Sequence, residues 1–283
     1  MIFLIGDDNL NYFDKKNEMA YTAKLHTDFT DKVFKEEIKR AISNCTIYDK
    51  TPDVPPSENN PVEIKLVNIN HESFIFSDDV KAYLDEGRRV CVHNFASYKS
   101  PGGLFLLGST AQEECLCHVS GLYNVLRKFE GNYYLKNRRN LNRGLYKNVA
   151  IYSKDIPFFI HGEPNKTRSN ARYLDVLTIA APNASTMRRY KLFTPDENEL
   201  VLKSRIEFIW KILAHKKVDI FITGAFGCGV FKQDPYMVAD IMMNTIRDNR
   251  NYPKKVIFVI PDGENFSKFD EVISGYLKMK RSF

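Results

Sequence analysis

The stretch "VDIFITGAFGCGVF", Val218 to Phe231, joins a continuous apolar run to a glycine-rich turn. Strands that are covered on both faces read as unbroken apolar segments, so the run predicts a buried strand. Asp234-Pro235 follows the turn and has the residue types of a helix N-cap and first helical position. A glycine-rich turn between a strand and a helix exposes backbone N–H groups. The stretch therefore predicts either phosphate binding or a tight turn that needs positive φ.

Further apolar runs of the same kind occur along the chain, with amphipathic helical patterns between them. The strands are expected at 62–69, 89–96, 148–153, 174–181 and 255–261, and the helices at 28–44, 77–87, 111–129, 197–217 and 235–248. This alternation predicts an α/β protein with a largely buried, parallel or mixed sheet. Ligands in such sheets bind beyond the carboxyl ends of strands. The polar or glycine-rich segments "HNFAS", "APNAS" and "GAFGCGVF" each follow a strand and are the places to look for a site.

The composition is that of a folded globular protein, with 43% hydrophobic residues in 283. A net charge of +6 suits a polyanionic partner but falls short of a dedicated nucleic-acid-binding composition. Basic pairs such as Arg138-Arg139 are read as solvated surface that could also attract a polyanion. The five cysteines are scattered, which favours reduced thiols and a cytosolic setting. No apolar run is long enough to predict a membrane span.

A second glycine-containing stretch, "PGGLFLLGSTAQEE", runs from Pro101 to Glu114. Its spacing fits a helix capping box in two registers, Thr110 with Glu113 or Ser109 with Gln112. Capping accounts for Glu113 without any chemistry but leaves Glu114 unexplained. Successive helical residues diverge by about 100°. Both carboxylates therefore reach one ligand only if that ligand lies near the helix N-terminus, and the choice between capping and acid–base chemistry stays open.

Other polar positions carry weaker signals. The segment "CLCH", Cys115 to His118, has no second ligand cluster, so core thiols are expected and no metal site. Cys228 has no visible His or Asp partner that would make it a nucleophile. His93 is expected to be a packed histidine, whereas Asn94 is either a turn residue or a ribose ligand.

Taken together, "VHNFAS", "PGGLFLLGSTAQEE", "AIYSKDIPFF", "LTIAAPNAS", "GAFGCGVFKQDP" and "VIFVIPDGENFSKF" resemble the microbial-type poly(ADP-ribose) glycohydrolases, a branch of the macrodomain superfamily. The signature of that family is a glycine triplet followed closely by Gln-Glu-Glu. The resemblance runs from about Met19 to the C-terminus. It implies a three-layer macrodomain-like fold with a mixed central sheet flanked by helices, divided into an N-terminal helical extension and loop (1–60) and a catalytic core (61–283) packed as one unit.

The resemblance also implies roles for individual residues. Glu114 is similar to the family's catalytic acid–base, and Glu113 to its neighbour that binds the distal ribose. The ligand-binding positions implied are Asn94, Phe95, Ala96, Ser97, Gly102, Gly103, Leu104, Gln112, Gly224, Ala225, Phe226, Gly227, Cys228, Gly229, Val230 and Phe231. Leu104 departs from the family pattern, because it stands where the third glycine of the triplet is expected. Its side chain would either crowd the diphosphate loop or point into the core.

The function implied is hydrolysis of ribose–ribose O-glycosidic bonds in poly(ADP-ribose), without a cofactor or metal. The alternatives are a mono-ADP-ribosyl hydrolase and a non-catalytic reader of ADP-ribose; an unrelated phosphate-binding α/β protein would leave the ordered motifs unexplained. The partner expected is ADP-ribose or its polymer, free or attached to protein, with no membrane and no specific nucleic acid. We expect a monomer in the cytoplasm, or in the host cytosol or nucleus if the source is viral.

Overall fold

The computed structural model describes residues 12–54, 60–249 and 252–280. Its centre is a seven-stranded sheet in the order β1-β4-β5-β3-β6-β7-β2. The strands are β1 (Thr46–Tyr48), β2 (Glu63–Val67), β3 (Val90–Phe95), β4 (Ala150–Phe158), β5 (Arg172–Ile179), β6 (Ile220–Thr223) and β7 (Lys255–Val259). Within the described residues only β4 runs against its neighbours β1 and β5. The sheet is therefore mixed, as the sequence predicts.

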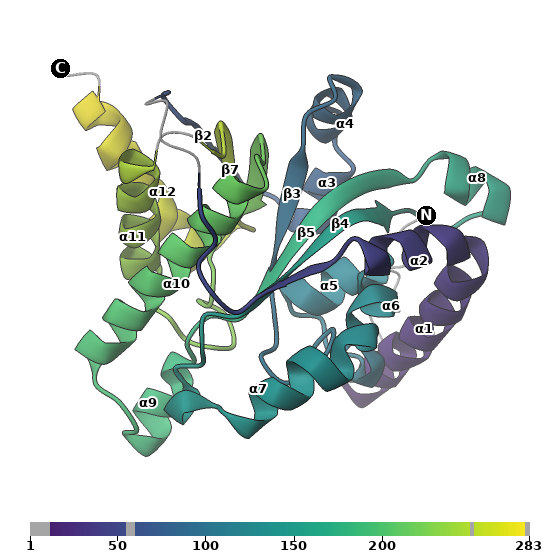
Figure 1. Cartoon of the computed structure of the whole chain (residues 1–283), viewed down its shortest axis with the longest axis horizontal. Coiled ribbons are helices and arrows are strands. Elements are labelled where there is room, and N and C mark those ends of the chain that lie inside the picture. The colour runs from purple at the N-terminus through teal and green to yellow at the C-terminus, as the bar shows by residue number, and fades with distance from the viewer. Residues whose placement is uncertain (1–11, 55–59, 250–251, 281–283) are drawn as a thin grey trace.

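Helices cover both faces of this sheet (Figure 1). They are α1 (Tyr12–Val33), α2 (Lys35–Ser43), α3 (His71–Ile75), α4 (Asp78–Asp85), α5 (Gln112–His118), α6 (Leu122–Leu126), α7 (Leu135–Arg139), α8 (Pro164–Ser169), α9 (Ala184–Tyr190), α10 (Pro195–His215), α11 (Pro235–Asp248) and α12 (Glu264–Lys280). Short 3-10 or π turns are η1 (Phe105–Leu107), η2 (Arg127–Phe129), η3 (Glu130–Tyr134) and η4 (Asn142–Gly144).

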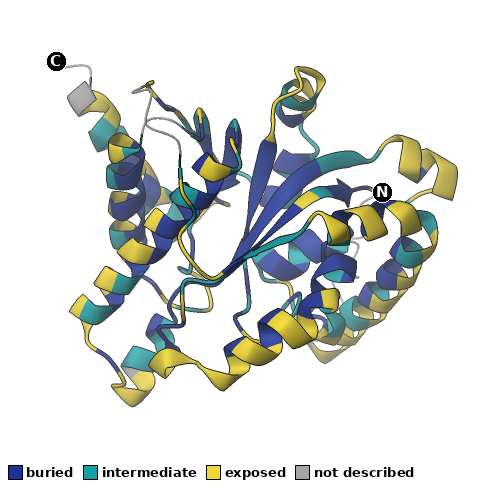
Figure 2. Ribbon diagram, viewed as in Figure 1, coloured by how far each residue is buried: buried dark blue, intermediate teal, exposed yellow. Residues whose placement is uncertain are grey.

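Two apolar cores lie on the two faces of the sheet. Helices α10, α11 and α12 pack on one face, around Trp210, Phe221 and Phe258. Helices α1 to α6 pack on the other face, around Phe34 and Phe158. Figure 2 shows the buried residues in the sheet and on the inward sides of the helices. The predicted three-layer fold is confirmed, and none of the described helices is long and apolar enough to cross a membrane.

The N-terminal segment adds a strand that the apolar pattern did not predict. Strand β1 pairs with β4 in the same sheet, and α2 packs against β4. Residues 1–11 of the predicted N-terminal extension lie outside the described part of the chain. A three-residue strand is too short for its alternation to stand out in the sequence.

The helix predicted at 111–129 is wrong as a single element. It breaks between α5 and α6, where Ser120 forms a bridge with Phe158 and the Gly121 N–H donates to the Pro157 carbonyl at 2.9 Å. A Cβ at Gly121 would lie 2.4 Å from Ile38 Cδ1 and 3.1 Å from Pro157 Cγ, so a larger residue here would displace the Ile38 side chain. The helix predicted at 28–44 is likewise interrupted, because α1 ends at Val33 and α2 begins at Lys35.

The three strands that precede the candidate segments are neighbours in the sheet. Strand β3 lies between β5 and β6 and is parallel to both. The segments after Phe95, Ile179 and Thr223 therefore emerge at one edge of the sheet, which is where the site is expected. Asp234 caps α11 as predicted, since its side chain accepts from the Tyr236 N–H at 3.0 Å.

Candidate active site

Gln112 fixes the start of α5 to the end of β3. Its side-chain oxygen accepts from the Phe95 N–H at 2.9 Å, and its side-chain nitrogen donates to the His93 carbonyl at 2.7 Å. The carboxamide thus bonds to the β3 backbone on both sides of Asn94, as the backbone of a neighbouring strand would. As a result, the two residues after Gln112 are held against the loop that follows β3.

The carboxyl group of Glu113 is buried and surrounded by donors. Asn94 Nδ2 donates to Oε1 at 3.1 Å, and the Ser97 N–H donates to Oε2 at 2.7 Å. Only 3% of the residue is exposed. Burial raises the pKa of Glu113 to about 8, against the opposing effect of these donors and of the Gly102 N–H. The group is therefore held rigidly in a dry environment.

The carboxylate of Glu114 lies against the glycine turn. Its Oε1 accepts from the Leu104 N–H at 2.8 Å. A Cβ on Gly103 would come within 2.3 Å of Glu114 Oε1 and 3.1 Å of Glu113 Oε2. The two carboxyl groups thus both lie against Gly103, where the absence of a side chain leaves room for them. This geometry meets the condition that the sequence set, since both groups face the same point beside the N-terminus of α5.

The capping interpretation of Glu113 is wrong. Helix α5 begins at Gln112, its N-cap residue is Ala111, and no side chain caps it. The side chains of Gln112 and Glu113 are drawn away to β3 and to the following loop instead. The structure therefore assigns these polar groups to tertiary contacts rather than to the helix end.

The first glycine turn donates its N–H groups within the protein. Gly103 donates to the Ser100 carbonyl at 3.1 Å, Leu104 donates to Glu114, and Gly102 donates to Glu113. Gly102 and Gly103 have φ values of +63° and +60°, which L side chains rarely adopt. Gly102 and Leu104 thus direct their N–H groups to the two carboxyl groups. The contact of the glycine pair with a diphosphate, which the resemblance implies, stays a prediction.

Leu104 does not need to be glycine. Its φ of −109° is ordinary for any residue, and its side chain is 52% exposed rather than buried in the core. Its contribution to the site is the backbone N–H on Glu114, which is independent of the side chain. The departure from the family triplet therefore leaves the turn intact.

The second glycine loop offers free donors. The N–H groups of Gly229, Val230 and Phe231 make no hydrogen bond to any residue in the described ranges. Gly229 and Val230 are exposed, and Phe231 is half-buried with its ring 6.0 Å from that of Tyr146. Exposed backbone N–H groups without a partner in the protein are available to an anion. Of the two loops, this one is therefore the one whose N–H groups have no acceptor within the described chain.

Some residues expected to bind a ligand are buried instead. Asn94, Ala96, Phe226 and Cys228 are all buried. Asn94 holds Glu113, and the Phe226 ring packs 4.5 Å from that of His93. Burial raises the pKa of Cys228 to about 12, which keeps the thiol protonated and excludes a nucleophilic thiolate. His93 is fully buried, as expected for a packed histidine.

Gln233 supports the second loop and was not among the expected site residues. It donates to the Pro182 carbonyl at 2.8 Å and exchanges hydrogen bonds with Asn198 of α10. The Ser185 N–H also donates to the Phe231 carbonyl at 3.0 Å. These contacts tie the loop to the segment after β5. The motifs "APNAS" and "GCGVFKQDP" contain both partners, but their spacing does not reveal that the two segments touch.

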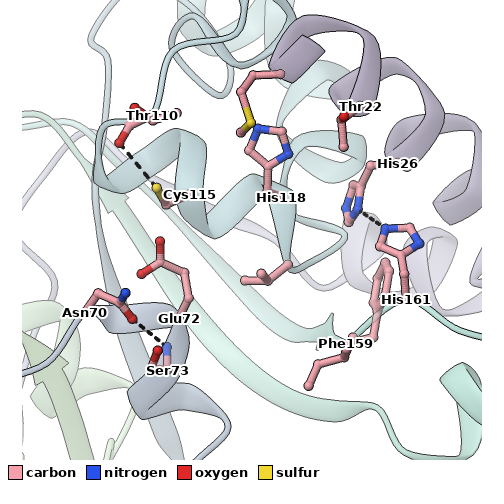
Figure 3. Close-up of a pocket in the computed structure, with 13 residues that line it drawn as sticks. Thr22, His26, Asn70, Glu72, Ser73, Thr110, Cys115, His118, Phe159 and His161 are labelled. Carbon is pink, nitrogen blue, oxygen red and sulfur yellow. Dashed lines mark hydrogen bonds between the residues drawn. The ribbon is translucent and has the colours of Figure 1, made fainter. Parts of the chain in front are cut away.

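Helix α5 also borders a separate cavity of about 140 Å³, on which Cys115 and His118 lie (Figure 3). His26 of α1 lines this cavity. Its Nδ1 atom lies 2.7 Å from Nε2 of His161, and its Nε2 atom lies 2.8 Å from the Ser120 carbonyl oxygen. Within the described ranges no group of three His, Cys, Asp or Glu side chains is arranged to hold a metal ion. Cys117 is buried, as predicted for a core thiol.

We expect His26 to make the fold sensitive to acid. Burial lowers its pKa to about 3 from 6.5, so the folded protein keeps the ring neutral while the unfolded chain takes up a proton below pH 6.5. Stability is therefore lost as the pH falls. We therefore compare how far the unfolding free energy falls between pH 7 and pH 5. At about 1.36 kcal/mol per pH unit below 6.5, the fall should be about 2 kcal/mol smaller in His26→Gln than in the wild type. Urea titrations at both pH values measure this, and equal losses in the two proteins would contradict it.

Comparison with known proteins places this geometry in a family. The family model described as "Microbial-type PARG, catalytic domain" matches residues 16–161, more than half of the chain. No curated protein sequence matches the chain. The fold is shared with the poly(ADP-ribose) glycohydrolase (PARG) of Thermomonospora curvata at 23% identity and a TM-score of 0.77, over 90% of this chain and 99% of that one.

A second solved structure with this fold is the PARG of Deinococcus radiodurans in complex with ADP-ribose. It has 22% identity and a TM-score of 0.72, over 84% of this chain and 97% of that one. The T. curvata enzyme bound to the inhibitor ADP-HPD is similar at a TM-score of 0.75, with 23% identity over 90% of this chain and 99% of that one. The family match includes the first glycine turn, Glu113 and Glu114. This chain belongs to the microbial-type PARG catalytic domain family.

Proposed function

We propose that the protein is a poly(ADP-ribose) glycohydrolase that cleaves ribose–ribose O-glycosidic bonds and releases ADP-ribose. The observation that carries this proposal is the convergence of Glu113 and Glu114 on Gly103, beside a loop with three unpaired backbone N–H groups. Membership of the family supports the same activity. We further propose that it works as a monomer in the cytoplasm, on polymer that is free or attached to protein.

Glu114 is the proposed general acid and base. Cleavage of a glycosidic bond passes through an oxocarbenium-like state, in which the departing ribose oxygen needs a proton and the attacking water needs a base. One carboxyl group performs both steps in turn, first giving its proton to the leaving oxygen and then taking one from water. The N–H of Leu104 holds one oxygen of Glu114, which leaves the other oxygen to face the bond.

Glu113 is the proposed anchor of the distal ribose. Because its pKa is raised to about 8, the group is mostly neutral near pH 7. A neutral carboxyl at this position adds no negative charge to the site, which favours the approach of an anionic diphosphate. Asn94 and the Ser97 N–H hold Glu113 in one position, so it orients the sugar without moving.

The second glycine loop is the proposed diphosphate site. The N–H groups of Gly229, Val230 and Phe231 are unpaired within the described chain, and phosphate oxygens are the acceptors that such groups favour. The Phe231 ring is the proposed packing surface for the nucleotide. The first loop then places the carboxyl groups, while the second loop places the substrate.

We expect Leu104→Gly to keep turnover within about threefold of the wild type, because the backbone N–H to Glu114 is retained. The added glycine freedom should cost stability by roughly 0.5–1 kcal/mol. Steady-state release of ADP-ribose, with thermal unfolding in parallel, measures both. A gain or loss of turnover above tenfold would mean that the side chain of Leu104 touches the substrate.

The experiment that tests the proposed function compares two substrates. The protein is incubated with poly(ADP-ribose) and, separately, with a mono-ADP-ribosylated protein, and free ADP-ribose is measured. Release from the polymer alone is the expected result. Release from the mono-ADP-ribosylated protein would assign the alternative hydrolase, and binding of ADP-ribose without release would assign a reader.

A further inference from the structure

A groove of about 940 Å³ lies beside the candidate site, between β1, α7 and the start of α10. Amide, tyrosine and lysine side chains dominate its walls, among them Tyr98, Asn132, Lys136, Asn140 and Lys147. Asp49 is the one carboxylate among its described lining residues. In Figure 1, α7 lies at the same lower edge of the sheet as α9, which follows β5. We call this feature the asparagine groove.

The segment that forms most of the asparagine groove is strongly biased toward positive charge. Residues 131–154 contain six lysines or arginines and no aspartate or glutamate. Arg138 pairs with Glu130, and Arg143 pairs with Glu197 at 2.8 Å. Lys136 and Lys147 are exposed on the rim, and neither forms an ion pair with any described residue. The rim thus presents two cations whose charge is not neutralised by the protein.

A buried cation lies behind the wall of the asparagine groove. Arg205 of α10 is fully buried, and its guanidinium donates to Asn148 Oδ1 at 2.6 Å and to the backbone carbonyls of Leu145 and Ala180. These acceptors are all neutral, and among the described residues no carboxylate pairs with it. A buried charge without a counter-ion is costly and creates a positive potential that an anion would relieve.

The asparagine groove and the candidate site share a wall. Tyr98 lines the groove, and the preceding residue, Ser97, donates its N–H to Glu113. The Tyr98 carbonyl accepts from Asn137 of α7 at 3.0 Å. Tyr146, another lining residue, lies 6.0 Å ring to ring from Phe231 of the second glycine loop. A substrate that continues beyond the catalytic loops therefore meets this groove.

We propose that the asparagine groove is a second subsite, which holds the ADP-ribose unit adjoining the one at Glu114, with Lys136 and Lys147 on its diphosphate. This inference rests on the proposed function. The volume is within the roughly 300–1,000 Å³ of small-molecule sites. Asn137, Asn142 and Asn148 donate to protein acceptors, whereas the exposed carboxamides of Asn132 and Asn140 and the two lysines are donors suited to sugar hydroxyls and phosphates. The tyrosine rings of the groove are buried and their faces are not free for base stacking, so the sugar–diphosphate part is the portion recognised.

The test measures binding in the Glu114→Gln background, where turnover does not intervene. The probes are long-chain poly(ADP-ribose) and single ADP-ribose. Adding Lys136→Glu and Lys147→Glu should lower the ratio of polymer affinity to ADP-ribose affinity by about tenfold or more. The slope of log K for polymer binding against log salt should also become shallower by about 1.4. This value assumes two lost phosphate contacts, at about 0.7 each on a single strand.

The matched control is the pair Lys24→Glu and Lys203→Glu, which makes the same charge change at exposed positions outside the groove lining. It should leave the affinity ratio within about twofold. An equal loss in the control pair would overturn the subsite, because net charge alone would then explain the binding. Single-stranded RNA of matched charge that binds as tightly, with the same sensitivity to the groove pair, would also overturn it in favour of a nucleic-acid site.

A separate assay distinguishes this proposal from the proposed function. Wild-type protein is given a dimer of ADP-ribose, which contains one scissile bond. Release of ADP-ribose with an unchanged affinity ratio in the groove pair would overturn the subsite and leave the function standing. Absence of release would overturn the function, and the binding arms would still decide whether the groove holds the polymer.

Discussion

Replacing Glu114 with Gln should abolish turnover and preserve binding. The amide cannot give or take the proton that bond cleavage needs, and general acid–base groups contribute about 10²–10⁴-fold. We therefore expect kcat on poly(ADP-ribose) to fall by at least about a hundredfold. The amide oxygen can still accept from the Leu104 N–H, so ADP-ribose affinity should stay within about threefold.

The control for this substitution is Glu37→Gln. Glu37 is as buried as Glu114, at 6% exposure each. It lies in α2, however, and pairs with Arg168 of α8. Loss of this partner should lower stability and leave kcat unchanged. Release assays on polymer, with calorimetric titration of ADP-ribose, decide the matter. Survival of turnover in Glu114→Gln within a few-fold of the wild type would remove Glu114 from the mechanism.

Gly103→Ala is the second substitution with a large expected effect. A Cβ at this position would lie 2.3 Å from Glu114 Oε1, so the carboxyl group has to move by an ångström or more. A misplacement of about 1 Å costs roughly a hundredfold in rate, and we expect a loss of that size in kcat. The φ of +60° adds a strain of about 1–2 kcal/mol to the folded state.

Gly87→Ala is the control that separates backbone strain from displacement of the Glu114 carboxyl group. Gly87 has a φ of +70°, and a Cβ there would meet nothing within 4 Å. This variant should show a similar loss of stability in urea unfolding and keep its full rate of ADP-ribose release. If Gly103→Ala also kept its rate, the closeness of the two carboxyl groups to Gly103 would be irrelevant to the reaction.

Several features of the molecule were readable from the sequence alone. The apolar runs predicted six of the seven strands, since a strand buried on both faces has few polar residues along its length. The three strand-end motifs indicated the edge of the sheet where the candidate site lies. The order of the glycine and Gln-Glu-Glu motifs identified the family, and the match over residues 16–161 agrees with it.

Tertiary structure decided how those motifs act on one another. Spacing alone suggested that Glu113 caps its helix, whereas the folded chain draws it to Asn94 and Ser97, because unpaired donors in a buried loop need an acceptor. Likewise, the folded chain directs the N–H groups of Gly102 and Leu104 to the carboxyl groups of Glu113 and Glu114. The direction of a backbone N–H depends on φ and ψ, which the spacing of residues does not state.

The asparagine groove is a second feature that residue spacing could not predict, because it is built by contacts between distant segments. Its walls come from segments that are far apart in the chain, around residues 49, 98, 140 and 204. In the sequence Arg138-Arg139 is an ordinary basic pair, and Arg205 is one cation within an amphipathic helix. Only packing reveals that Arg205 is buried without a carboxylate among the described residues while Lys136 and Lys147 stay exposed. Sequence determined which elements form and what chemistry they carry; tertiary contacts decided which charges meet, because burial and distance arise only when the elements pack.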